Sequence, residues 1–211
     1  AEGSTKFIRT QGFGSEKPIR RRSWNPLASA PPTADGTWDV CVVRAQSWQT
    51  IKMASDYIES GQHQFRSVVL DSVTEIQNKC KRNMSVSVMQ QQDWGKLLEM
   101  MDTLMRGLRD TTEVETNPLE TVVFVAETKM QDGRWTPYMQ GAIGARMPYW
   151  VDVCGFVEQV DALDANGQAT LRNVHMTIVN NERSVAGERL QGILPKVILN
   201  PNISVLHSII Y

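Results

Sequence analysis

Two short apolar runs, each ended by a polar side chain, constrain the fold of this chain more than any other feature. The first spans 67–72 and the second spans 121–126. Continuous apolar character is typical of parallel strands that are buried on both faces, whereas half-exposed strands alternate apolar with polar residues. Between the runs, Asp93 precedes apolar residues at helical spacing and is the expected N-cap of a helix. Strand, helix and strand in this order predict a βαβ unit.

The pattern around this unit predicts further elements. Asn166-Gly167 separates two alternating segments, which predicts a C-terminal β-hairpin. The segment 1–38 is rich in Gly and Pro, so we expect a long loop there, with 11–37 as an insertion. The polar segment 127–140 is also expected to be a loop. The other expected elements are strands at 38–43 and 194–199 and helices at 47–59, 73–81, 141–150 and 201–211.

Composition excludes several classes of protein. The 211 residues suit a single domain spanning 1–211. Lys plus Arg number 22 against 23 Asp plus Glu, so the chain has no overall basic field and any site for a polyanion must be local. No apolar run approaches the roughly 18 residues of a membrane span, and we expect a cytoplasmic protein without a membrane partner. The three cysteines are far apart, which argues against disulfides and structural zinc.

The sharpest local signal is Asp71 at the end of the first apolar run. Ligands of open α/β sheets bind at the carboxyl ends of the strands, and P-loop ATPases hold a magnesium ion there with an acid. The alternative is structural, because many buried strands end in an Asp that caps the next helix. The residue alone does not decide between a ligand site and a cap.

The order of elements over 67–127 resembles the RecA-like ATPase core. It is more closely similar to the RecA-like nucleotide-binding proteins of tailed phages, some of which act in recombination, and the resemblance covers most of the chain. It implies an α/β fold with a mainly parallel sheet flanked by helices and followed by a C-terminal β-hairpin. It also implies ATP and Mg²⁺ as cofactors, a homo-oligomer, and the host cytoplasm as the location if a phage encodes the chain.

The same resemblance implies catalytic roles for named residues. Glu2 looks like the end of the family's Asp-x-Glu motif and would be the general base that orients the attacking water. Asp71 would bind Mg²⁺ through water, with Ser72 beside it at the cofactor. Glu127 would occupy the place of the polar side chain that senses the γ-phosphate. These roles suit phosphoryl transfer, which depends on placed charge more than on covalent catalysis.

One departure from the family pattern is large. No G-x-x-x-x-G-K-[ST] segment occurs in the 211 residues, so the phosphate-binding loop with its Lys is missing. We therefore expect this chain alone not to hydrolyse ATP. Two explanations compete, an ATPase truncated at its N-terminus and a degenerate relative without nucleotide. The start at Ala1, inside the apparent motif, favours truncation.

Two segments correspond to the DNA-facing loops of RecA-like recombinases, 79–92 and 128–140. Their cations and aromatic rings could neutralise and stack on single-stranded DNA, although Trp135 could equally pack on its own domain. The residues singled out are Lys79, Lys81, Arg82, Lys129, Arg134, Trp135 and Tyr138. A second basic cluster at 20–24 is more typical of a solvated loop.

Arg183 is the candidate for a cation that reaches the nucleotide of a neighbouring subunit, and a plain surface arginine is the alternative. Together these features predict Mg²⁺-dependent ATP hydrolysis, in the complete protein, coupled to DNA recombination or single-strand annealing. One alternative is a non-catalytic module that binds single-stranded DNA or serves in assembly, and another is a phage ATPase that acts in replication or packaging. Fold-level resemblance supports function less strongly than it supports fold.

Overall fold

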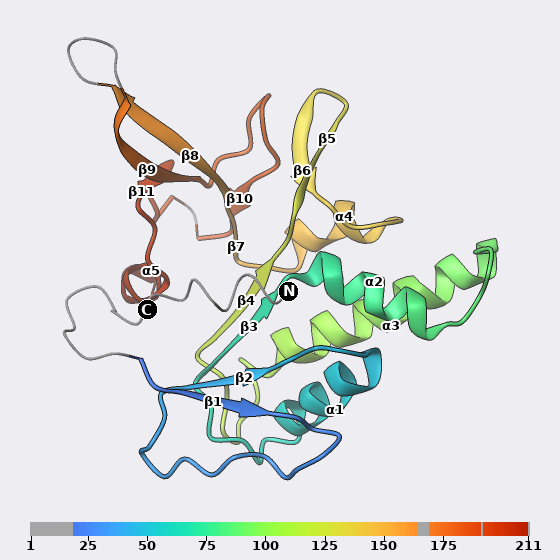
Figure 1. Ribbon diagram of the computed structural model, residues 1–211. Coiled ribbons are helices and arrows are strands. Elements are labelled where there is room, and N and C mark those ends of the chain that lie inside the picture. The colour runs from blue at the N-terminus through green and yellow to red at the C-terminus, as the bar shows by residue number, and fades with distance from the viewer. Residues whose placement is uncertain (1–18, 164–168, 191, 211) are drawn as a thin grey trace. The chain divides into compact units, whose positions relative to one another are not determined.

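Strands β3 (Ser67–Asp71) and β4 (Thr121–Val125) pair in parallel, as the two apolar runs predict. The register sets Ser67 opposite Thr121 and Asp71 opposite Val125, so both strands end at the same edge (Figure 1). These coordinates come from a computed structural model, which describes residues 19–163, 169–190 and 192–210. Glu2 and the expected loop at 1–18 therefore lie outside the described residues.

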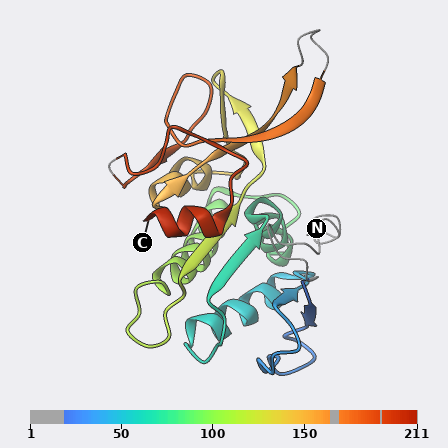
Figure 2. The same ribbon diagram turned by 90° about the vertical axis from the view of Figure 1, so that its left-hand side faces the viewer.

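Three helices accompany this strand pair, and α2 and α3 lie on one side of it (Figures 1 and 2). The expected apolar ladder of α3 is confirmed, since its buried face includes Leu97, Met101 and Leu108. The expectation that β3 is buried on both faces is wrong for the described residues. Leu70 is buried, but Val69 is 56% exposed because the helices cover one face only. The helices are α1 (Trp48–Glu59), α2 (Val73–Asn83) and α3 (Gln91–Asp110).

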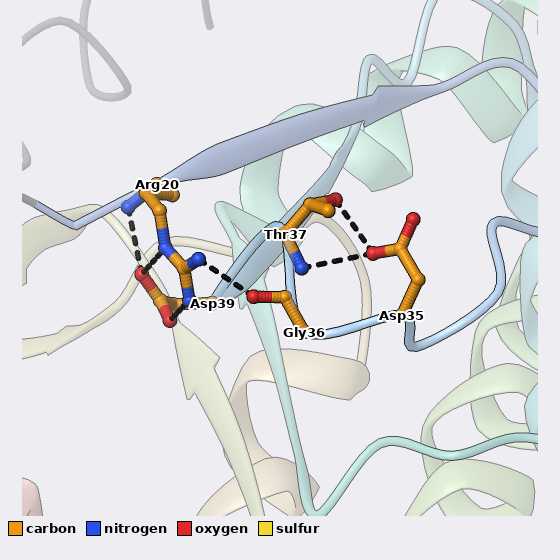
Figure 3. A network of polar contacts seen from close by, with 5 residues as sticks. All are labelled: Arg20, Asp35, Gly36, Thr37 and Asp39. Atoms are coloured by element: carbon orange, nitrogen blue, oxygen red, sulfur yellow. Dashed lines mark hydrogen bonds and ion pairs between the residues drawn. The ribbon is translucent and has the colours of Figure 1, made fainter.

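A strand forms inside the range expected to be a loop insertion. Strand β1 (Arg21–Trp24) pairs in parallel with β2 (Val40–Val43). Its sequence has no apolar run, and of its four side chains only Trp24 is buried. Long-range contacts hold it instead, since the Arg20 guanidinium donates to both carboxylate oxygens of Asp39 and to the Gly36 carbonyl (Figure 3). The sequence pattern missed this strand because pairing and an ion pair, not periodicity, stabilise it.

The Arg20–Asp39 contact predicts a pH dependence. The hydrogen bond from Arg20 lowers the pKa of Asp39 to about 2, below its ordinary value of 3.8. A lowered folded-state pKa stabilises the protein above the unfolded-state value, and this stabilisation is lost as the pH falls through the folded-state value. We expect the free energy of unfolding of wild type minus that of Asp39→Asn to be constant above about pH 5 and to shrink as the pH falls towards 2. Urea unfolding across this range measures it, and a difference that does not vary with pH would contradict the assignment.

The chain divides into two units, residues 1–126 and 127–211, and each is described by itself. The second unit begins with a hairpin of β5 (Thr128–Gln131) and β6 (Arg134–Pro137), where the sequence pattern predicted a loop. The turn explains the difference. Asp132 and Gly133 have φ of 51° and 78°, and Asp-Gly is favoured where two consecutive turn residues need positive φ.

The predicted C-terminal hairpin is confirmed. Strands β8 and β9 pair antiparallel, β11 pairs with β9 on its other side, and β7 pairs with β10. A short α4 runs into a 3₁₀ turn where a helix over 141–150 was expected. The bounds are α4 (Ile143–Arg146), the 3₁₀ turn (Met147–Tyr149), β7 (Val153–Cys154), β8 (Phe156–Leu163), β9 (Ala169–Thr177), β10 (Gly187–Glu188), β11 (Val197–Leu199) and α5 (Ile203–Ile210).

The mixed α/β class is thus confirmed. Parallel pairing among the described residues occurs in two separate two-stranded sheets, β1 with β2 and β3 with β4, so a larger RecA-like parallel sheet stays a prediction. The three cysteines are free thiols, as expected, and burial raises the pKa of Cys80 to about 12. No described helix is long and apolar enough to cross a membrane.

Candidate metal and nucleic-acid sites

Asp71 is the last residue of β3 and lies at the carboxyl edge of the parallel strand pair. The residue is exposed and follows the alternation of β3, so it shares the open face with Val69, while Leu70 is buried. No described residue gives its carboxylate a hydrogen bond or an ion pair. The acid is therefore available to a ligand on the open face.

Ser72, not Asp71, caps helix α2. Its Oγ accepts a hydrogen bond from the Glu75 amide at 3.3 Å, and its backbone is extended, as expected for an N-cap. The structural alternative for Asp71, a helix cap, is therefore taken by its neighbour. The signal was present in the sequence, because Ser72-x-x-Glu75 has the spacing of a capping box.

A single carboxylate at this edge fits magnesium. Mg²⁺ keeps several waters and is commonly held by one or two carboxylates together with phosphate oxygens. The described residues contain no cluster of three or more His, Cys, Asp or Glu that could form a protein-only metal site. Unlike the metal ion, the triphosphate of ATP needs a dedicated phosphate-binding segment. The phosphate-binding segment that would hold it is missing from the 211 residues, so these residues do not fit a bound triphosphate by themselves.

The cations predicted to face DNA after Asp71 all lie on α2, which extends to Asn83, two residues beyond the expected end of the helix at Lys81. Lys79 pairs with Glu75 at 3.4 Å. A hydrogen bond from Asn78, and next the contact with Lys79, lowers the pKa of Glu75. Lys81 lies 5.1 Å from the centroid of the Trp94 ring.

These contacts define what α2 can offer a ligand. Lys81 and Arg82 occupy the last turn of the helix, where positive charge interacts favourably with the helix dipole. Both Lys79 and Lys81 have intramolecular partners, whereas Arg82 is exposed. The α2 cations therefore have a structural explanation beside the predicted nucleic-acid role.

Strand alternation divides the predicted DNA residues of the β5–β6 hairpin into two sets. Lys129 is opposite Thr136, and Arg134 is opposite Gln131, so these four side chains share one face. All four line a concavity of about 540 Å³, whose wall also includes Tyr149 and residues 185–189. Trp135 belongs to the other face. The guanidinium of Arg134 and the indole of Trp135 therefore lie on opposite faces of the hairpin. A loop, in contrast, could have directed both side chains to one ligand.

The aromatic side chains of this segment also have partners. The Trp135 ring stacks on Phe156, with centroids 6.4 Å apart and an interplanar angle of 19°, which agrees with the alternative that Trp135 packs on its own unit. The Lys129 Nζ lies 5.8 Å from the centroid of the Tyr138 ring. Tyr138 is 38% exposed, and its amide donates to the Glu127 carbonyl at 2.6 Å. Lys129 and Tyr138 are thus the hairpin pair best placed to meet a ligand.

Arg183, the predicted trans cation, contacts a neighbour in its own unit. Its Nη2 donates to Glu158 Oε2 at 2.6 Å, with the Arg183 side chain 66% exposed and that of Glu158 22% exposed. Surface ion pairs of this kind contribute about 0–1 kcal/mol, so the contact orients the guanidinium without immobilising it. Glu127, the predicted sensor residue, precedes β5 and is the first residue of the second unit.

Comparison with known families decides the superfamily. The family model described as AAA domain matches residues 33–190, about three quarters of the chain. The chain belongs to the AAA domain family. Membership places it among nucleotide-binding proteins of the P-loop NTPase type. No curated protein matches the chain. All the predicted site residues except Glu2 lie inside the matched span of this AAA domain.

Proposed function

We propose that Asp71 is the magnesium-binding acid of an AAA-type ATPase. One observation carries the proposal: the Asp71 carboxylate lies at the carboxyl end of a parallel strand and has no partner among the described residues. The cap of the following helix is supplied by Ser72, so capping does not require Asp71. This is the position at which open α/β sheets bind ligands. An acid needed for capping would contact the α2 amides, and Asp71 does not.

The chain's own residues would then divide the work. Bound Mg²⁺ would neutralise charge that develops on the transferred phosphoryl group. Asp71 would hold the metal through water, and Ser72 would keep α2 anchored beside it. We assign Glu127 to sensing the γ-phosphate and Glu2 to orienting water. No hydrolysis step is assigned to the 211 residues, because no phosphate-binding segment is among them.

The finer part of the proposal concerns DNA. We assign the complete protein to a phage, as a homo-oligomer. In it, ATP hydrolysis would be coupled to recombination or to annealing of single-stranded DNA. Lys129 and Tyr138 support a nucleic-acid surface on the β5–β6 hairpin, since a cation beside a partly exposed ring suits backbone and base. The exposed guanidinium of Arg183 supports its assignment as the cation that reaches a neighbour's nucleotide.

A second candidate function is a module that binds single-stranded DNA or serves in assembly without catalysis. The observation that favours it is the missing G-x-x-x-x-G-K-[ST] segment. In that case DNA binding would not depend on nucleotide. The two functions are therefore distinguished by whether Mg²⁺ and ATP change the binding of DNA by the protein.

Binding of a fluorescent ATP analogue tests the proposal, with and without Mg²⁺, on the 211-residue chain and on the full product of its gene. We expect the full product to bind the analogue only when Mg²⁺ is present. DNA binding that is equal with and without nucleotide, combined with no analogue binding by either polypeptide, would establish the non-catalytic function instead.

A further inference from the structure

The guanidinium of Arg134 is bonded within its own unit. Its Nη2 donates to the Asn180 side-chain oxygen and, at 3.1 Å, to the Ser184 carbonyl. Its Nε is buried and has no hydrogen-bond partner among the described residues. A ligand on the surface cannot reach a buried Nε. Arg134 is therefore poorly suited to the DNA contact that its sequence context predicted.

The main chain joins the same two segments. The Trp135 amide donates to the Arg183 carbonyl at 2.8 Å, and the Val185 amide donates to the Trp135 carbonyl at 2.9 Å. These bonds form a parallel bridge in which Trp135 is opposite Ser184. Residues 183–185 thus lie along β6, joined to it by an isolated parallel bridge.

The segment 180–185 has its own internal order. The Asn181 side-chain oxygen accepts from the Arg183 and Ser184 amides, each at 2.8 Å, so the turn before the bridge is closed. Ser184 is 1% exposed. Arg183 leaves this ordered backbone and contacts Glu158 on β8. The position of the Arg183 guanidinium therefore depends on how 180–185 is held against β6.

We infer that Arg134 is a positioning residue that ties Arg183 to the β5–β6 hairpin, so that a ligand that displaces the hairpin also displaces Arg183. The inference rests on the proposed function in one respect, that the ligand of the hairpin is single-stranded DNA. The tie itself depends only on the contacts within the second unit. DNA that binds the hairpin would thereby change the position of Arg183, the cation assigned to the nucleotide of a neighbouring subunit.

Arginine is needed for this tie for a geometric reason. Its planar fork reaches two acceptors on one segment, Asn180 and Ser184, whereas an ammonium group is a point charge without a fixed fork. Removal of the guanidinium leaves the Ser184 carbonyl without this charged donor, and hydrogen bonds to charged groups are stronger than those between neutral groups. Lys at this position should therefore restore the charge without restoring the tie.

Amide hydrogen exchange on the full chain tests the tie, with the amides of Trp135 and Val185 as probes and those of β8 and β9 as internal reference. In Arg134→Gln we expect exchange at both probes to rise about tenfold or more, and Arg134→Lys should not restore protection. Asn180→Ala removes one partner from the opposite side and is the milder variant if Arg134→Gln does not fold. Gln131→Ala is the matched control, because Gln131 is on the same face of the hairpin, has no bond to 180–185 among the described residues and is assigned no DNA contact.

A second arm adds an oligothymidine of about 30 nucleotides, which is longer than the roughly 4–16 nucleotides that one OB-fold site for single strands covers. We expect DNA to change exchange at Val185 in wild type and not in Arg134→Gln. Equal exchange at Trp135 and Val185 in Arg134→Gln and Gln131→Ala would overturn the tie. DNA binding that leaves Trp135 and Val185 unchanged in wild type would overturn the coupling. Absence of any DNA binding would contradict the DNA part of the proposed function, while the first arm still decides whether Arg134 holds Arg183.

Discussion

Replacement of Met101 by Ala is expected to lower the free energy of unfolding of the first unit by about 2–5 kcal/mol. Met101 lies in the middle of α3, and its side chain is 0% exposed. Truncation removes apolar area from the contact of α3 with α1 and α2 and leaves a cavity that the surrounding helices can fill only in part. Most small domains are stable by only about 5–15 kcal/mol, so this change is a large fraction of the total.

Met53→Ala is the matched control for this prediction. Met53 lies on α1 and is 40% exposed, so the same chemical truncation should change stability by less than about 0.5 kcal/mol. Urea unfolding followed by circular dichroism measures both variants, and amide exchange on α3 localises the effect. Equal losses for Met53→Ala and Met101→Ala would show that α3 is not the core of the unit.

The success at α3 shows what sequence patterns predict well. Leu97, Met101, Leu104 and Leu108 repeat at helical spacing, and each is buried. The helix start was predicted less accurately. Asp93 is the third helical residue, and its carboxylate accepts from the amide of Gln90, the actual N-cap. Glutamine is not among the preferred N-cap residues, so the local pattern favoured the wrong residue.

The elements that were missed depend on partners distant in sequence or on turn chemistry. The short strand β1 depends on Arg20 and Asp39, which are 19 positions apart, so no local window contains its cause. The β5–β6 hairpin had a local signal in Asp132-Gly133, but the polar strands around it lack an apolar alternation. Missing the hairpin also meant missing the separation of Arg134 from Trp135 onto opposite faces.

The candidate site was predicted in part for a similar reason. Asp71 could be placed from sequence, because a strand that ends in an acid has a defined edge. That Ser72 and not Asp71 caps α2 was settled by the structure. Whether a cation is available to a ligand depends on side-chain partners. Lys79 and Arg134 proved to be engaged within the chain, which composition and spacing could not indicate.

Replacement of Asp71 by Asn is expected to abolish Mg²⁺-dependent ATP hydrolysis by the full gene product while leaving the fold unchanged. Metal ions stabilise a phosphoryl-transfer transition state by several kcal/mol, and each 1.36 kcal/mol is tenfold in rate, so turnover should fall by about 10²-fold or more. The amide is nearly isosteric with the carboxylate but carries no charge for the metal. The exposed Asp71 has no partner among the described residues, so stability should change by less than about 0.5 kcal/mol.

Two controls separate metal binding from helix capping at this edge. Ser72→Ala removes the cap of α2 and should cost about 0.5–2 kcal/mol of stability, which Asp71→Asn should not. Asp56→Asn removes an exposed carboxylate of α1 that pairs with Lys52, and turnover should be unchanged. Turnover and urea unfolding are measured on all three variants. Metal binding by Asp71 predicts the largest loss of turnover in Asp71→Asn and the largest loss of stability in Ser72→Ala. Wild-type turnover in Asp71→Asn, or a stability loss there as large as in Ser72→Ala, would mean that Asp71 supports the strand-to-helix junction and that the metal is held elsewhere.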